Sequence, residues 1–364
     1  MNLPFFFKRA VFLLYRKHTI KKHELNYLFW ECTLRCNLNC LHCGSDCTKL
    51  SGQSEMSVED FAKVLDDVKQ RNSAKRLTVC ITGGEPLLRN DLEKAGMEIV
   101  KRGFYWGIVT NALCFTEQRF FSLVRAGMTS ISFSLDGFSK EHTYLRQNKD
   151  SFERVLFAIK LVNNFQKHNP NYFVYDVITC VHKGNFGILR EFRDFLIEIG
   201  VKRWRIFSIF PEGRARQNDL SLSKNEYVEL MEFIQETRTY KNKNGKSIHL
   251  NYSCEGFLGK YELKVRDYFF FCRAGVNIAS VWCDGSVSGC LSVRAKDLIQ
   301  GNVYKEKLMN IWNKKFDVMR NHFWAKRGKC KNCKHWTDCL GNGMHLHQDL
   351  SSEVDRCNFE LSNL

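Results

Sequence analysis

The sequence lacks an apolar run of membrane-spanning length, which would take roughly 20 residues. It also lacks a signal-peptide pattern, because Lys8 and Arg9 interrupt the apolar N-terminus and no small-residue cleavage site follows. These absences predict a cytoplasmic protein. In a reducing compartment a disulfide framework is a poor explanation for 16 cysteines, so metal or cluster ligation is the better hypothesis.

The net charge of +16 is spread along the chain instead of being gathered in one stretch. Its densest part is residues 1–25, which we interpret as a basic amphipathic N-terminal extension. Two roles remain open for this segment. It could cap the following domain, or it could contact a membrane surface or a partner.

Residues 26–212 alternate short apolar runs with helical periodicity, and no internal repeat or low-complexity segment is evident. Strands are expected at 27–32, 77–82, 105–110, 130–135, 173–181 and 202–209. Helices are expected from 57 and near 90–102, 116–126, 151–166 and 187–199. This α/β pattern predicts a parallel sheet with helical crossovers, and its six units suit a partial (β/α)6 TIM-type barrel.

The pattern changes after this region. Residues 213–253 are polar with one helical stretch, which predicts a helical linker. In residues 254–364 cysteines recur among glycine, asparagine and aromatic residues with little periodicity. Such a segment usually needs a metal or cluster to hold it together, and we treat it as a separate cysteine-rich domain.

Cys36, Cys40 and Cys43 form a C-x3-C-x2-C pattern directly after the first expected strand. Three thiolates are one ligand short of a closed tetrahedral site. The loop at the C-terminal end of a barrel strand is where such folds place their chemistry. Three cysteines there could hold a [4Fe–4S] cluster and leave one iron open for a small molecule.

This region resembles the radical S-adenosylmethionine (SAM) enzymes, whose signature is C-x3-C-x-φ-C. Later motifs of the family follow in order at expected strand ends, namely "TGGEP" at 82–86, "VTNA" at 109–112, "SLDG" at 134–137 and "FPEGRA" at 210–215. The resemblance implies that the cluster cysteines are Cys36, Cys40 and Cys43. It implies SAM contacts by His42, Gly83, Gly84, Glu85, Pro86, Asn111, Ser134 and Asp136, with "TGGEP" at the methionine amino group, from whose ammonium Glu85 can accept a hydrogen bond, and "SLDG" facing the ribose. Cysteines outside the family pattern are expected to be non-ligands, namely Cys32, Cys47, Cys80, Cys114 and Cys180.

The C-terminal cysteines resemble the SPASM auxiliary iron–sulfur domain found in many of these enzymes. By that resemblance, one auxiliary [4Fe–4S] site uses Cys330, Cys333, Cys339 and Cys357. A possible second site uses Cys254, Cys272 and Cys290. The family pattern has a further cysteine where Gly343 stands, so the second site lacks at least one thiolate. Cys283, His345 or His347 could help there, and one or two auxiliary clusters both remain open.

The resemblance implies an oxidoreductase that reductively cleaves SAM and abstracts a hydrogen atom through a 5′-deoxyadenosyl radical. SPASM enzymes mostly modify peptides, so the main hypothesis is a peptide- or protein-modifying enzyme that forms a crosslink or oxidises a side chain. Leu291, where formylglycine-forming members have Asp, counts against that activity. The expected partners are a peptide or small protein substrate and an electron donor such as flavodoxin or ferredoxin, with no nucleic acid.

Two alternatives to the peptide hypothesis remain. One is action on a tetrapyrrole or small metabolite, since "CNLNCLHC" also resembles haem-modifying members. The more remote one is a zinc-ribbon nucleic-acid-binding protein, which the charge and the C-x2-C-x5-C spacing allow.

Overall fold

The computed structural model describes residues 5–73, 76–253 and 256–362, and its centre is a parallel sheet. Every strand expected between 26 and 212 is present, with bounds within one residue of those expected. These strands are β1 (Tyr27–Thr33), β2 (Thr78–Gly83), β3 (Tyr105–Thr110), β4 (Ser130–Ser134), β5 (Val174–Val181) and β6 (Arg203–Ser208). Each pairs in parallel with the next along the chain, which confirms the predicted α/β class.

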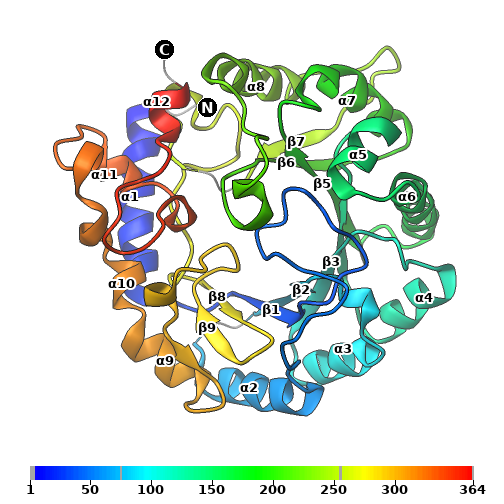
Figure 1. The fold of residues 1–364 in the computed structure, drawn as a ribbon, viewed down its shortest axis with the longest axis horizontal. Coiled ribbons are helices and arrows are strands. Elements are labelled where there is room, and N and C mark those ends of the chain that lie inside the picture. Colours follow the sequence, from blue (N-terminus) through cyan, green and yellow to red (C-terminus); the bar gives the residue numbers. More distant parts are fainter. Residues whose placement is uncertain (1–4, 74–75, 254–255, 363–364) are drawn as a thin grey trace.

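Helices connect successive strands and lie outside the curved sheet, as Figure 1 shows. They are α2 (Val58–Arg71), α3 (Leu92–Lys101), α4 (Glu117–Arg125), α5 (Ser139–Arg146), α6 (Ser151–His168) and α7 (Leu189–Glu198). Ser57 caps α2, since its hydroxyl accepts a hydrogen bond from the Asp60 N–H at 3.0 Å. The sequence pattern predicts all of these helices except α5, which is short and follows β4 closely.

The cysteine-rich region belongs to the same sheet, which the sequence does not predict. The strand order is β10-β9-β8-β1-β2-β3-β4-β5-β6-β7. The added strands are β7 (His249–Tyr252), β8 (Ile278–Val281), β9 (Ser286–Ser288) and β10 (Gly301–Asn302). β7 extends the sheet in parallel beyond β6, and β8 pairs in parallel with β1. The segment expected to be a helical linker therefore holds a helix, α8 (Lys224–Thr237), and also the strand β7.

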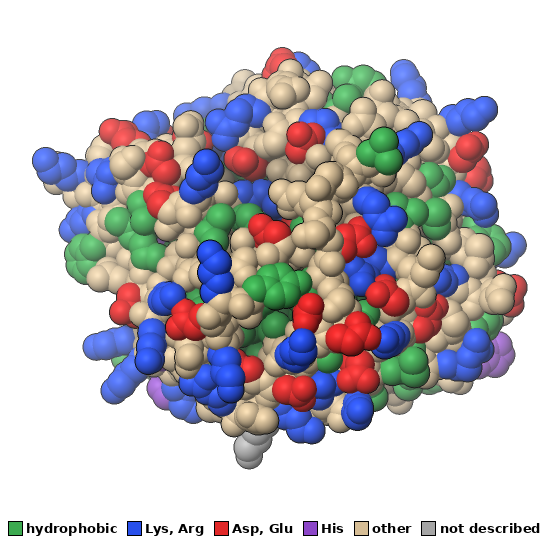
Figure 2. Space-filling view, turned by 60° about the horizontal axis from the view of Figure 1, so that its bottom comes forward, with side chains coloured by type: hydrophobic (Ala, Val, Ile, Leu, Met, Phe, Trp, Pro, Cys, Tyr) green, Lys and Arg blue, Asp and Glu red, His purple; other side chains and the backbone are tan. Residues whose placement is uncertain are grey.

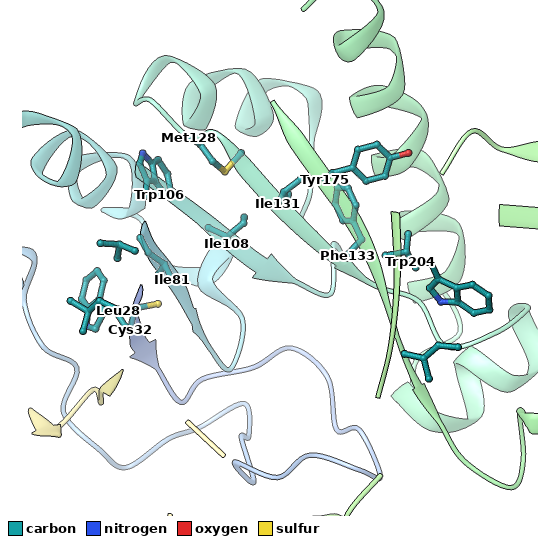
Figure 3. Close-up of a cluster of buried hydrophobic side chains, with 14 of the residues drawn as sticks. Leu28, Cys32, Ile81, Trp106, Ile108, Met128, Ile131, Phe133, Tyr175 and Trp204 are labelled. Carbon is teal, nitrogen blue, oxygen red and sulfur yellow. The ribbon is translucent and has the colours of Figure 1, made fainter. Parts of the chain in front are cut away.

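One continuous hydrophobic core fills the space between sheet and helices. Figure 3 shows part of it, where Ile81, Ile108 and Ile131 project from neighbouring strands toward Trp106 and Met128. The Trp106 indole N–H is satisfied by the Ala126 carbonyl at 3.1 Å, so this large side chain is buried without an unpaired donor. Because the core continues into the C-terminal region, the sheet there is held by packing as well as by its strand pairing.

The C-terminal region is otherwise built from short helices and loops. Its α-helices are α9 (Leu308–Lys315), α10 (Asp317–Arg320), α11 (Trp336–Cys339) and α12 (Asn358–Ser362). The N-terminal helix α1 (Phe5–Lys22) packs against α11, with the Arg9 guanidinium bonding both carboxylate oxygens of Asp338 at 2.6 and 3.0 Å. Within the three described ranges, no helix is long and apolar enough to span a bilayer.

Candidate functional site

The three cysteines of the C-x3-C-x2-C pattern lie together in the loop that follows β1. Cys36 and Cys40 are buried and Cys43 is partly buried, and all three belong to one apolar cluster. Cys47 lies in the same cluster. The loop thus brings the three predicted ligands together, with a fourth thiol beside them whose position the sequence pattern does not explain.

Each predicted ligand sulfur has an N–H group directed at it. Asn111 Nδ2 lies 3.8 Å from Cys36 Sγ, Arg146 Nη1 lies 3.7 Å from Cys40 Sγ, and the Cys47 backbone nitrogen lies 3.5 Å from Cys43 Sγ. Burial raises the pKa of Cys36 to about 12 and also raises the pKa of Cys40, where Arg146 opposes the rise. Hydrogen bonds from the thiol and backbone of Cys47 instead lower the pKa of Cys43 to about 5. Donors of this kind stabilise thiolates, the form that binds iron, so these residues fit an iron–sulfur cluster.

The two glycines of "TGGEP" let the end of β2 lie against the cysteine loop. A Cβ on Gly83 would come within 2.2 Å of the Thr33 carbonyl oxygen, and one on Gly84 within 2.1 Å of the Arg35 carbonyl oxygen. The Gly84 N–H donates to Thr33 O at 2.7 Å. In this structure the lack of a side chain at both glycines lets the backbone after β2 lie directly against the backbone after β1. Their contact with the SAM amino group stays a prediction.

Glu85 joins the ends of β2 and β3. It is fully buried, and its carboxylate accepts hydrogen bonds from the Thr110 hydroxyl at 2.8 Å and the N–H groups of Leu87 and Asn111 at 3.0 and 2.8 Å. Burial outweighs these donors and raises the pKa of Glu85 to about 7. Since three protein donors already bond to this carboxylate, its acceptance of a ligand ammonium also stays a prediction.

A buried ion pair lies beyond β4. Arg146 Nε, on α5, bonds Asp136 Oδ2 at 2.6 Å, and the other oxygen, Oδ1, accepts from the Cys180 N–H at 2.8 Å. Burial by itself would raise the pKa of Asp136, but the Arg146 guanidinium and the adjacent His42 and His142 lower it to about 2. Both oxygens of Asp136 are thus engaged by the protein, and its contact with a ribose stays a prediction.

The remaining predicted SAM contacts lie around this edge of the sheet. Ser134 ends β4, Pro86 opens the turn after β2, and Asn111 follows β3. Nδ1 of His42 is buried with no hydrogen-bond partner, and burial lowers the pKa of His42 to about 3. A neutral imidazole with an open nitrogen is suited to meet a polar group of a bound ligand.

The thiols expected to be non-ligands are dispersed over the sheet, except for Cys47. Cys32 is fully buried in the core beside Leu28, as Figure 3 shows. Cys80 lies within β2, Cys114 follows β3, and Cys180 lies within β5.

The four cysteines of the first predicted auxiliary site are close enough to influence one another electrostatically. Deprotonation of Cys330 is opposed by Cys357 and Cys333, and that of Cys339 by Cys357 and Cys330. Burial, the larger cause, raises the pKa of Cys330 to about 11 and that of Cys339 to about 12. Among the described residues, no three His, Cys, Asp or Glu side chains are placed to hold a single metal ion.

This auxiliary site lies next to the mouth of the barrel. Cys330 packs in a small apolar cluster with Leu346, Val354 and Phe210, and Phe210 lies just past the C-terminal end of β6. The cysteine loop after β1 reaches the same side, because Arg214 donates to the Cys40 carbonyl at 2.8 Å. Both cysteine groups therefore border the segment 210–215.

The second auxiliary site is only partly described. Cys272 and Cys290 are close enough to interact electrostatically, whereas Cys254 lies outside the described residues. The Met344 N–H bonds to Cys272, which places Gly343 beside this pair. A cysteine at 343 would thus lie next to Cys272, as the family pattern expects.

The side chains considered as substitutes for that cysteine have other contacts. Cys283 bonds Gln53 Oε1 at 3.7 Å, and His347 Nε2 bonds the Gly341 carbonyl at 2.8 Å. The His345 ring packs 4.6 Å from the Phe210 ring. Their service as cluster ligands stays a prediction.

Two arginines that the sequence analysis missed connect parts of the site. Arg146 joins Asp136 to Cys40. Arg294, in the cysteine-rich region, forms an ion pair with the buried Glu31 of β1 and bonds the Ser45 hydroxyl of the cysteine loop at 2.6 Å. No motif marks either arginine, because Cys40, Glu31 and Ser45, which they reach, are distant from them in the sequence.

Two family models match the chain. The model of the radical SAM superfamily matches residues 30–196, and the SPASM model, an iron–sulfur cluster-binding domain, matches residues 272–334. An AdoMet-dependent heme synthase of Methanosarcina barkeri is 24% identical over 330 residues, which are 86% of this chain and 89% of the relative. An Fe-coproporphyrin III synthase of the same organism is 24% identical, over 88% of this chain and 84% of that protein.

Solved structures share the fold. SuiB of Streptococcus suis bound to S-adenosylmethionine superposes with a TM-score of 0.72 at 17% identity, covering 96% of this chain and 81% of SuiB. SuiB bound to its precursor peptide SuiA superposes with a TM-score of 0.71 at 17% identity, covering 96% of this chain and 80% of SuiB.

Proposed function

The chain is a radical SAM enzyme with a C-terminal SPASM domain, and we propose that its substrate is a tetrapyrrole. Its cofactors are [4Fe–4S] clusters and SAM. When bound, they supply a 5′-deoxyadenosyl radical that abstracts a hydrogen atom from the substrate. The remaining question is which substrate reacts with that radical.

The observation that carries the proposal is the extent of the match to two tetrapyrrole enzymes. The heme synthase and the Fe-coproporphyrin III synthase are matched over more than four fifths of both chains, so the likeness includes the barrel and the cysteine-rich region. This favours the alternative of the sequence analysis over its main hypothesis of a peptide substrate.

The residues at the barrel mouth are compatible with such a substrate. Arg214 and Arg356 border it. Arg214 donates to the Cys40 carbonyl and pairs with Asp46 at 2.7 Å. Arg356 donates to the Ile209 carbonyl and the Ser208 hydroxyl, so a propionate would share these guanidiniums with the protein. Haems and coproporphyrins carry propionate carboxylates, which guanidinium groups recognise. The apolar surface of Phe210 between the two cysteine groups could pack against a macrocycle.

What this chain's own residues contribute is binding and orientation. N–H groups that donate to the sulfurs of Cys36, Cys40 and Cys43 hold these side chains in place. The Arg146–Asp136 ion pair fixes the backbone after β4 beside them. Enclosure of the site by the loops after the strands would protect a reactive radical from water.

The experiment uses the full chain, reconstituted anaerobically with iron and sulfide. Incubation with SAM, dithionite and Fe-coproporphyrin III is expected to yield 5′-deoxyadenosine together with a mass change of the tetrapyrrole. A variant with Cys36, Cys40 and Cys43 all changed to Ala should give neither. Production of 5′-deoxyadenosine with an unaltered tetrapyrrole would contradict the substrate while leaving the radical chemistry intact.

A peptide substrate is the second candidate. What supports it is the fold shared with SuiB bound to its precursor peptide, a likeness that at 17% identity extends to the fold alone. Mass spectrometry of small proteins incubated with the reconstituted enzyme would test it.

The zinc-ribbon nucleic-acid hypothesis has no support from the matched families. On the face shown in Figure 2, Lys and Arg side chains are interspersed with Asp and Glu instead of forming a continuous basic groove.

A further inference from the structure

The outer face of α1 is unusually apolar for a surface helix. Phe6 is 81% exposed, Leu14 71%, Phe7 53% and Val11 50%. Residues 7, 11 and 14 recur at helical spacing, so these side chains share one face. Contiguous exposed apolar surface of this kind marks an interaction site.

The inner face of the same helix combines arginines with Phe12, whose ring packs against Phe269 and Phe271. Arg16 is buried and donates to the carbonyls of Thr337 and Asp338 at 2.5 and 3.0 Å, while Arg9 pairs with the Asp338 carboxylate. A helix that faced only water on its outer side would place polar side chains there. The four large apolar side chains exposed on this face indicate that it meets an apolar phase.

A groove beside α1 widens this apolar surface. Its volume is about 680 Å³, and it lies between the helix and the segment 263–273. Tyr268, on its far side, is 75% exposed. Phe12 lines the groove from α1 and packs against Phe269 at 5.2 Å between ring centroids. The exposed surface therefore continues from the helix onto a neighbouring loop.

The charges around this surface are positive. α1 has no acidic residue, and its basic side chains outside the inner face are Lys8, Lys17, Lys21 and Lys22. The nearby carboxylates are paired, Asp338 with Arg9, Asp267 with Arg238 and Glu24 with Lys22, which leaves Lys8, Lys17 and Lys21 as the unbalanced charges. Phe6, Phe7 and Val11 lie in the N-terminal half of the helix and Leu14 near its middle, whereas most of the lysines lie in its C-terminal half.

We propose that the outer face of α1, together with Tyr268, docks on the surface of a membrane that contains anionic lipids. Phe6, Phe7, Val11 and Leu14 enter the headgroup region, and the lysines contact lipid phosphates. A fluid surface suits this face because the helix is convex and offers few hydrogen-bonding groups besides its lysines. Figure 1 shows α1 at the margin of the molecule, on the side of α10 and α11, so docking there leaves the barrel mouth accessible.

Co-sedimentation of the full chain with lipid vesicles tests the proposal. Vesicles of phosphatidylcholine with phosphatidylglycerol are expected to bind the protein, vesicles of phosphatidylcholine alone to bind it weakly, and salt to reduce binding. The double variant Phe6→Ser/Leu14→Ser should lower the partition coefficient by at least about tenfold, given the apolar area removed. Lys17→Glu/Lys21→Glu should abolish the preference for anionic vesicles.

Matched controls separate this surface from general hydrophobicity and net charge. Val100→Ser/Phe157→Ser removes two exposed apolar side chains from α3 and α6, and Lys160→Glu/Lys167→Glu makes the same charge change on α6. Both controls should bind vesicles as the unaltered chain does. All variants should unfold at the same urea concentration, since every changed side chain is on the surface.

Three results would overturn the proposal. The first is a chain that remains in the supernatant with anionic vesicles, and the second is α1 variants that bind as the controls do. The third is a concentration-dependent dimer that Phe6→Ser/Leu14→Ser dissociates without any vesicle binding, which would make this face an interface between two copies. Vesicle binding needs neither SAM nor tetrapyrrole, so its outcome is independent of the proposed substrate.

Discussion

Arg146 and Asp136 form a buried ion pair with 2.6 Å between Nε and Oδ2, and the same guanidinium reaches to 3.7 Å from Cys40 Sγ. One side chain thus connects the end of β4 to the predicted cluster loop.

We expect Arg146→Ala to leave the Asp136 carboxylate buried and without its cation, a change that typically costs about 3–5 kcal/mol of unfolding free energy. Urea unfolding of the reconstituted protein measures it. Lys140→Ala, on the exposed side of the same helix, should change the unfolding free energy by less than about 0.5 kcal/mol. Equal effects of the two variants would contradict the role of the ion pair.

The raised pKa of Glu85, about 7, predicts a pH dependence of stability. Between pH of about 4 and 7 the folded chain keeps a proton on Glu85 that the unfolded chain has lost, so the unfolding free energy falls as pH rises. The shift corresponds to roughly 2–4 kcal/mol over that window. Urea midpoints across it should show a shallower fall in Glu85→Gln than in the unaltered chain, whereas Glu229→Gln, at an exposed position of α8, should keep the full fall.

Iron content decides how many auxiliary clusters the chain holds. With two, reconstituted protein should carry about twelve irons per chain, and the variant with Cys36, Cys40 and Cys43 changed to Ala about eight. The exposed Cys114, changed to Ala, should leave the count unaltered. About eight irons in the unaltered chain would instead indicate a single auxiliary cluster.

Arg294 is expected to hold the cysteine-rich region against the barrel. Arg294→Ala leaves the buried Glu31 without its cation and should lower the unfolding free energy by about 3–5 kcal/mol. Adding Glu31→Gln should restore part of the loss, because the unpaired charge is then removed. The comparison is Arg190→Ala. Arg190 forms an exposed ion pair with Glu236, so its loss should lower the unfolding free energy by no more than about 1 kcal/mol. A double variant no more stable than Arg294→Ala would contradict this coupling.

Much of the barrel was predictable because its signals are local. The runs that became β1 to β6 are short, apolar and separated by amphipathic helices, so their bounds follow from periodicity within each run. β7 to β10 escaped prediction because they have two to four residues each, too few for a period to show. β7 and β8 take their place in the sheet by pairing with β6 and β1, which lie far away in the chain, and β9 and β10 follow from β8.

By itself, the sequence determined the α/β class, the family and the cysteine spacing, since each is written in residues close together along the chain. Only the tertiary structure decided which side chains support the cysteines and what the N-terminal helix exposes. Arg146, Arg294 and Asn111 reach the cysteine loop across long sequence separations, so packing alone brings them into place. The same reason explains α1, whose composition indicated an amphipathic helix, while its contact with α11 turned Arg9 and Arg16 inward and left Phe6 and Phe7 outside.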